Sequence, residues 1–448
     1  MRSVAEDRKP YLDEFARLEK EEPGNGRAWV GPIRRAAIDR FAERGFPTQK
    51  EEAWRCTSVQ PIVRAAFMPA QGGRGEGLTP EVLESLTFEP WDCSHLVFVN
   101  GRYVPGLSRL RGGPPGLKVK SLQEALAADR DQVEPHLERV LGPGGAARPF
   151  ADLNTAFLRD GAFVFVPAGA VVEEPIHLLF VSTAEERPTV SHPRALVVAG
   201  DASQATIVES FVGIRDDLYF TNAVTEIVAG AGSVLDHYRL QRESREAFHV
   251  SSLRVAIGRN GTVASHAIAL GGALVRNDVD VLLGAEGGDC TLNGLYVTSG
   301  RQHVDTHTVI DHARPNGTSR ELYKGVLDDA SRGVFDGMIL VRADARKSDA
   351  RQENRNLLLS EEALVDSKPT LQILNDDVKC SHAATIGQLD EDALFYLRSR
   401  GIGDEAARSL LVHAFMSDVV GRIKVAPVRA GLDCLLFTRL PKHHGARS

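Results

Sequence analysis

The sequence predicts a mainly β protein whose core is a parallel β-helix, with α-helical segments on both sides of it. From about residue 160, short strands rich in Val, Ile and Leu alternate with turns rich in Gly, Asp and Asn. The strands that end in glycine do so at steps of 31, 30, 28 and 26 residues, at Gly169, Gly200, Gly230, Gly258 and Gly284. Strands at a nearly constant step, without helices between them, are typical of a coiled stack with one turn per step.

We expect the turn glycines to supply the left-handed backbone conformation at the corners of this stack. An antiparallel sandwich also contains short strands at even spacing, and it is the alternative that the pattern alone leaves open.

Residues 1–150 are expected to form a mainly helical N-terminal domain. Tyr11–Glu21 and Pro32–Arg44 carry apolar residues at helical spacing, and Leu122–Leu141 is a further helical stretch. A β-hairpin is expected around Asn100-Gly101, because this pair suits a type I′ turn.

The β-helix core is expected to span residues 151–388, with an insertion around Arg301–Glu321. Residues 389–448 are expected to form a C-terminal helical domain, with helices at 390–401 and 404–423. Two short helices bury only part of their apolar surface against each other. They must therefore pack on the sheet domain or on a partner protein.

Composition and charge exclude several classes of function. The 448 residues carry a formal net charge of -7 without the basic stripe of a nucleic-acid reader. No apolar run approaches the length of a membrane span, and the first residues show no secretory signal. The five cysteines are widely spaced and form no CxxC pair, which argues against a disulfide framework or a zinc knuckle. We therefore expect a cytoplasmic protein.

Cys380-Ser381-His382 is the sharpest local feature. On a strand, the first and third residues point to the same face, so a thiol and an imidazole would lie together there. Such a pair could bind a soft or borderline metal, or act as a nucleophile and its base. A small buried cysteine beside a hydrogen-bonded histidine is the structural alternative, which the residues alone favour.

His303, Asp305 and His307 also share a strand face, and they could form a metal site with nitrogen and oxygen ligands. A polar stripe on an exposed edge is the interpretation that we prefer for them.

Three acidic pairs could suggest a carboxylate glycosidase, a function that β-helix proteins often have. Each pair stands beside an expected corner, where aspartate serves turn geometry, so we interpret them as turn residues. The pairs are Asp328/Asp329, Glu361/Glu362 and Asp376/Asp377. No phosphate loop, dinucleotide fingerprint or nucleophile elbow occurs in the sequence.

The stretch from residue 305 to 401 resembles the core of the SufB/SufD family of iron–sulfur cluster assembly proteins. The residues that carry the resemblance are Asp305–Thr308, His312, Gly317–Gly325, Ser331–Gly337, Asp349–Ser360, Asp377–Thr385 and Leu394–Gly401. The N-terminal part matches only through Glu51–Thr57. Cys56, Gln372 and Ala383 depart from the family's usual residues. Within the family, the Cys-Ser-His motif and the segment 394–401 are more similar to the SufD type of subunit than to the SufB type.

The resemblance implies a right-handed β-helix and a non-catalytic subunit that pairs with SufB through the end of that helix. His382 would lie at the seam with SufB, support iron supply and complete a metal site shared with the partner, with Cys380 beside it. No permanently bound cofactor is implied, only transient iron or a cluster at the seam.

The resemblance also implies that the C-terminal helices dock the ATPase SufC, and the apolar residues that fit this role are Leu410, Leu411, Phe415 and Val419. Association of two copies of the chain stays open. The rival functions are a cluster-holding SufB-like scaffold, for which Cys290, Cys380 and Cys434 are the available thiols, and a β-helix enzyme acting on carbohydrates.

Overall fold

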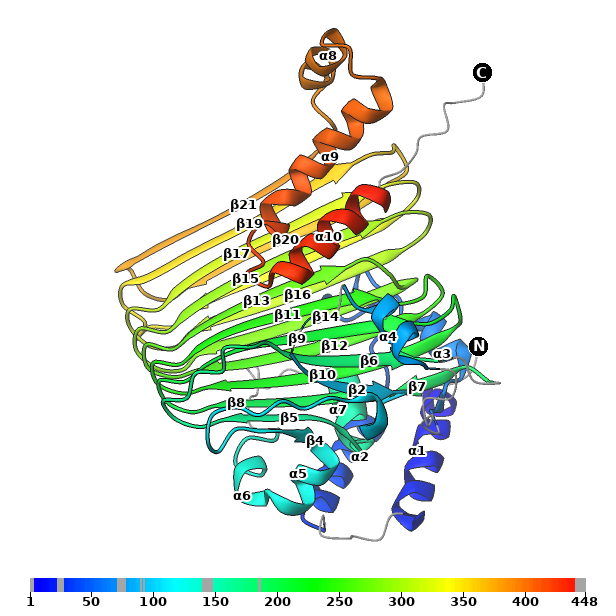
Figure 1. Cartoon of the computed structure of the whole chain (residues 1–448), viewed down its shortest axis with the longest axis vertical. Coiled ribbons are helices and arrows are strands. Elements are labelled where there is room, and N and C mark those ends of the chain that lie inside the picture. Colours follow the sequence, from blue (N-terminus) through cyan, green and yellow to red (C-terminus); the bar gives the residue numbers. More distant parts are fainter. Residues whose placement is uncertain are drawn as a thin grey trace.

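The computed structural model describes residues 4–21, 28–70, 78–88, 91, 93–138, 148–183 and 187–439. Its centre is a solenoid of parallel strands, with helices at both ends of the chain (Figure 1). None of the helices in the described ranges is long and apolar enough to cross a membrane.

The solenoid consists of two long sheets that the chain visits in turn. One sheet has the order β20-β18-β16-β14-β12-β10-β8-β5-β4, and the other has the order β21-β19-β17-β15-β13-β11-β9-β6-β2-β3. The strands that pair between β5 and β21 do so in parallel register, which excludes the antiparallel sandwich. The strands are β5 (Gly161–Val166), β6 (Ile176–Ser182), β7 (Thr189–Ser191), β8 (Arg194–Ala199), β9 (Gln204–Gly213), β10 (Tyr219–Ala229), β11 (Val234–Arg242), β12 (Phe248–Ile257), β13 (Thr262–Ala269), β14 (Leu274–Leu283), β15 (Asp289–Thr298), β16 (His303–His312), β17 (Thr318–Leu327), β18 (Arg332–Val341), β19 (Ser348–Leu358), β20 (Leu364–Ile373) and β21 (Val378–Gly387).

The glycine steps in the sequence correspond to one turn of this solenoid. Phe220 pairs with Phe248, and Phe248 pairs with Leu274, so successive turns advance by 28 residues (220 to 248) and 26 residues (248 to 274). Apolar side chains that point into the solenoid form one continuous core, from Leu96 to Phe335. Each turn therefore buries its inward residues against the turns on either side of it.

The expected role of the corner glycines is only partly correct. Gly169 has a φ of 73°, but Gly200 and Gly230 do not have a positive φ. A Cβ on Gly200 would lie 2.6 Å from the Ala168 backbone nitrogen, and one on Gly230 would lie 2.8 Å from that of Asp201. Glycine is needed at these two positions because the preceding turn passes too close for a side chain.

The expected insertion around Arg301–Glu321 is wrong. β16 and β17 occupy this stretch and pair in unbroken register with their neighbours on both sides. The polar residues of this stretch lie on ordinary strands of the repeat.

The N-terminal part is helical, but it also contributes strands to both sheets. β2 pairs in parallel with β6, and β4 pairs in antiparallel with β5. β2 and β3 form the expected hairpin, in which Asn100 and Gly101 both have positive φ, as a type I′ turn requires. The elements are α1 (Val4–Glu21), α2 (Val30–Arg44), η1 (Glu52–Trp54), α3 (Gln60–Ala65), β1 (Met68–Pro69), α4 (Pro80–Leu86), β2 (Ser94–Val99), β3 (Arg102–Tyr103), η2 (Pro105–Leu107), β4 (Lys118–Ser121), α5 (Leu122–Ala128), α6 (Arg130–Val133) and α7 (Pro149–Ala156).

The helix expected over Leu122–Leu141 is shorter and broken. α5 ends at Ala128, and α6 begins after Asp129. The Asp129 carboxylate pairs with Lys118 and Lys120 on β4, which holds it in a non-helical conformation. The last residues of the expected helix lie outside the described part of the chain.

Three C-terminal helices follow the last strand: α8 (Glu391–Ser399), α9 (Asp404–Val420) and α10 (Ala426–Arg439). α10 was not expected from the sequence. α9 and α10 pack on the outer face of the sheet that ends in β21, where Val419 is fully buried. Figure 1 shows α8 projecting beyond the solenoid, past β21.

Lys324 on β17 fastens α9 to this sheet. Its ammonium donates to the Phe415 carbonyl over 2.9 Å, lies 3.0 Å from the Asp418 carboxylate and stands over the Phe415 ring at 4.5 Å.

Candidate functional site at the open end of the solenoid

β20 and β21, together called the terminal rung, close the solenoid at its C-terminal end. Each is the last strand of its sheet, so within the described residues each has a neighbouring strand on one side only. Their outer backbone N–H and C=O groups are therefore free to pair with a further strand. Exposed apolar side chains surround this edge, at Leu364, Ile373, Leu374 and Ile386.

Cys380 and His382 lie on β21, in register with Ala350 and Gln352 of β19. Alternate residues of β19, including Ala350 and Gln352, are buried, so Cys380 and His382 stack on the inward-facing row. Their Cα atoms are two residues apart, about 6.6 Å along a strand. The structure thus brings these two side chains to one face, at the mouth of the solenoid.

The two side chains differ in their surroundings. Cys380 is half-buried against an apolar cluster that includes Leu371 and Ala350. Burial raises the pKa of the Cys380 thiol, the nearby Asp349 raises it further, and a backbone hydrogen bond at Ala350 opposes both. The thiol is therefore protonated at neutral pH and needs a cation or a metal to become a ligand. His382 is exposed.

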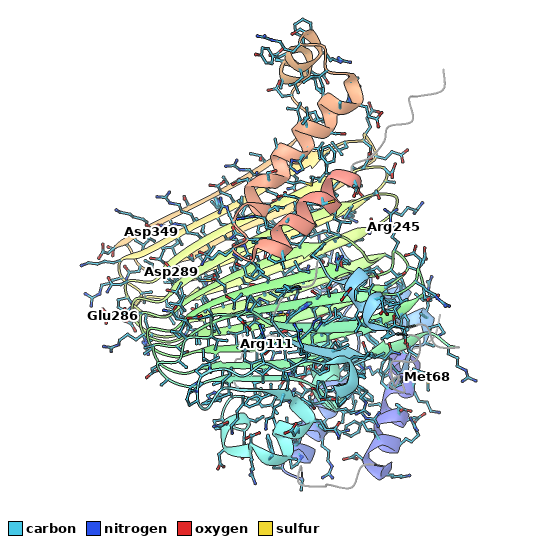
Figure 2. All side chains as sticks on the ribbon, viewed as in Figure 1. Met68, Arg111, Arg245, Glu286, Asp289 and Asp349 are labelled. Atoms are coloured by element: carbon cyan, nitrogen blue, oxygen red, sulfur yellow. The ribbon has the colours of Figure 1, made fainter. Side chains whose placement is uncertain are left out.

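Asp349 marks this end of the molecule in Figure 2, at the left corner of the solenoid. It pairs in register with Lys379, directly before Cys380, and its carboxylate lies 3.0 Å from the guanidinium of Arg320.

The stripe of His303, Asp305 and His307 is covered, and it does not lie on an exposed edge. Its strand, β16, lies between β14 and β18, and the N-terminal segment lies across it. The Thr57 hydroxyl lies 2.9 Å from His303 Nε2 and also donates to Asp305, which in turn accepts from Arg276 over 2.6 Å. Within the described ranges, no cluster of three or more His, Cys, Asp and Glu side chains could hold a metal.

The acidic pairs are turn residues, as expected. Asp328 accepts from the backbone N–H of Asp329, which has a φ of 52° and itself accepts from the N–H of Gly300. Asp377 donates its backbone N–H to Asn375 at the corner before β21. Glu361 and Glu362 are exposed at the corner between β19 and β20.

Comparison with known proteins identifies the family. A family model described as the SufBD core domain of SUF system FeS cluster assembly matches residues 180–415, more than half of the chain. The chain belongs to the SufBD family. A second model, the SufBD protein N-terminal region, matches residues 5–178. The likeness in the N-terminal part is therefore much wider than the motif at Glu51–Thr57 suggested.

Curated SufBD relatives align along most of the chain. The iron–sulfur cluster assembly protein SufD of Escherichia coli is 30% identical over 406 residues, covering 90% of this chain and 92% of that protein. The SufBD family protein slr0076 of Synechocystis is 34% identical over 407 residues, covering 89% and 88%. SufD of Bacillus subtilis is 30% identical over 289 residues, covering 62% and 64%.

Sequence reasoning found Cys380 and His382 but missed the surface around them. The expected end of the β-helix at residue 388 did not say which side chains of the last turn stay exposed, so the apolar rim could not be identified in advance. The residues expected to dock the ATPase also differ in their exposure. Leu410 is 44% exposed, Leu411 and Phe415 are half-buried, and Val419 is buried against the sheet.

Proposed function

We propose that this SufBD protein is a non-catalytic, SufD-type subunit that builds an iron–sulfur cluster together with a SufB partner at its terminal rung. The observation that carries the proposal is the open rung itself, which holds an exposed His382 among apolar side chains beside an unpaired strand edge. Exposed apolar patches next to unpaired strands are typical of surfaces that another protein covers.

A homologous solenoid is the partner whose shape fits this edge. Its own last strands would continue both sheets and pair the free backbone groups of β20 and β21. Leu364, Ile373 and Leu374 would then be buried against the partner's equivalent rim. This arrangement brings His382 to the seam between the two proteins.

Iron and sulfide are the cargo of such a seam. A neutral imidazole is a good ligand for iron, and a thiolate from the partner would complete a shared site with His382. Cys380 supplies a second, weaker ligand, since its raised pKa keeps it protonated until a cation approaches.

The ATPase SufC is the second partner that we propose. Phe395 on α8 is 71% exposed and Tyr396 lies beside it, while Leu410 extends the apolar surface onto α9. Val419 serves a different purpose, because it anchors α9 to the sheet. Movement of α8 on ATP hydrolysis would reach the solenoid through α9 and its Lys324 anchor, and would reshape the seam.

The test is anaerobic reconstitution with Fe²⁺ and sulfide of the chain co-purified with SufB and SufC, followed by visible absorption. His382→Ala should leave the complex intact but abolish the cluster band, since an exposed histidine contributes little to folding. Thr385→Ala, on the opposite face of the same strand, is the matched control. A normal band in the His382→Ala complex would overturn the proposal.

A second pair of variants tests the docking of SufC. Phe395→Ser should release the ATPase, whereas Phe437→Ser, which changes an aromatic residue of α10 that is 57% exposed, should retain it. If both variants bind SufC equally well, α8 is not the docking element.

A further inference from the structure

A column of polar side chains lies inside the solenoid directly beneath His382. Glu321 on β17 is in register with Gln352 on β19, and Gln352 is in register with His382 on β21. Glu321 and Gln352 are buried in the interior, and Gln352 is only 1% exposed. Neighbouring strands are about 4.8 Å apart, so the three residues of the column follow one another at about that spacing.

Only one end of the Gln352 side-chain amide has a hydrogen-bond partner in the structure. Its Nε2 donates to Glu321 Oε2 over 2.6 Å, while its Oε1 is buried without a partner in the structure. A buried amide oxygen without a hydrogen bond is costly, and it calls for a donor.

The orientation of the Gln352 amide is fixed by its neighbours. The amide nitrogen must face Glu321, because Oε2 accepts a hydrogen bond there. Burial raises the pKa of Glu321 to about 7, against the effect of Thr308 and Gln352, and above that pH the ionised carboxylate, which can only accept, holds the amide in this orientation. A Cβ at Gly337 would lie 2.3 Å from Gln352 Nε2, so the glycine leaves room for the amide. The oxygen is thereby left for the next turn, where His382 lies.

We propose that Gln352 is a positioning residue, which accepts a hydrogen bond from one ring N–H of His382 and so fixes the tautomer of that imidazole. The other ring nitrogen then presents its lone pair outward, toward whatever lies on the terminal rung. Outer partners of this kind orient metal-binding histidines in many proteins. The inference deepens the proposed function and rests on it for its consequence, although the hydrogen bond itself can be tested without any partner.

The first experiment is nitrogen-15 NMR of the histidine rings in the full chain, with the His382 signals assigned by their loss in His382→Ala. The unchanged chain should show a single tautomer for His382. Gln352→Leu, which is similar in size but cannot accept, should show both tautomers. The matched control is Arg351→Ala, one residue away on the outer side of β19, and it should match the unchanged chain. A single tautomer in Gln352→Leu would overturn the inference.

Two further variants test the inference in case Gln352→Leu does not fold. Glu321→Gln removes the anchor without changing size and should also mix the tautomers, because either end of the Gln352 amide can then face His382. The exchange Glu321→Gln with Gln352→Glu places an amide donor at position 321 and a carboxylate acceptor at position 352. The carboxylate at 352 can then accept from His382, and the double variant should recover a single tautomer. If the exchange fails to recover it while its circular dichroism is native, the column does not orient His382.

The second experiment is cluster reconstitution with SufB and SufC. Loss of an outer partner typically lowers metal affinity or activity by about 10- to 100-fold, and we expect a loss of that size for Gln352→Leu. If His382→Ala is harmless in this assay, the proposed function fails whatever the NMR shows. If His382→Ala abolishes the cluster but Gln352→Leu matches the unchanged chain in both experiments, only the role of Gln352 fails.

Discussion

Arg276 joins the N-terminal segment to the solenoid, and its replacement by methionine should cost about 3 kcal/mol of unfolding free energy. The buried guanidinium donates to Asp278 over 2.8 and 2.9 Å and to Asp305 over 2.6 Å, and lies 4.2 Å from the centre of the Trp54 ring. Removing one member of a buried ion pair costs about 3–5 kcal/mol, because the remaining charge stays buried. Methionine keeps most of the apolar contact with Trp54.

The lower end of that range applies because both carboxylates keep other partners. Asp278 lies 3.6 Å from Arg148, and Asp305 lies 3.0 Å from His307. Urea unfolding followed by tryptophan fluorescence and circular dichroism measures the change. The control is Arg332→Met, since Arg332 pairs with Asp366 on a half-exposed surface and should cost less than about 1 kcal/mol. Equal costs for the two variants would refute the reasoning.

Three further predictions concern other parts of the molecule. Gly294→Ala places a Cβ 2.0 Å from the Tyr323 ring and should cost about 1–3 kcal/mol by overpacking, whereas Gly387→Ala, with open space around it, should leave Tm unchanged. Burial acts to raise the pKa of Glu209, but its charged and hydroxyl neighbours lower it to about 2. Glu209 therefore stabilises the fold above the unfolded pKa of about 4.3, and this contribution disappears as pH falls toward 2. Acid titration of Glu209→Gln should show a smaller loss of stability over that window. Lys324→Met removes hydrogen bonds from a charged donor, each worth about 1.5–3 kcal/mol, and should speed amide exchange in α9. Unchanged exchange there would contradict its anchoring role.

The solenoid could be predicted from the sequence because its repeat is local. Strand, glycine corner and strand recur at almost equal steps, and each turn needs the same apolar row facing inward. The reason for Gly200 and Gly230 could not be predicted, because it depends on the backbone of the preceding turn. α10 was missed although it buries an apolar face. Its Gly431 lowers helix propensity, and that glycine is explained only by the Phe88 ring that packs against it.

The candidate site was predicted in part. The strand spacing of Cys380 and His382 correctly placed the two side chains on one face. The partners that explain the other polar residues come from far along the chain, as Thr57 does for His303 and Asp305. Gln352 gave no signal in the sequence, because its importance depends on the register that places it between Glu321 and His382.

The terminal rung has a thermodynamic consequence. In a stack where each turn is stabilised by the turns next to it, the last turn has one neighbour fewer and is the first to fray. β20 and β21 therefore gain the most order when another strand pair is added beyond them. A partner that supplies that pair would complete the site and stiffen it in one step, so assembly would add order to the strand that carries His382, beyond the orientation that Gln352 gives to its ring.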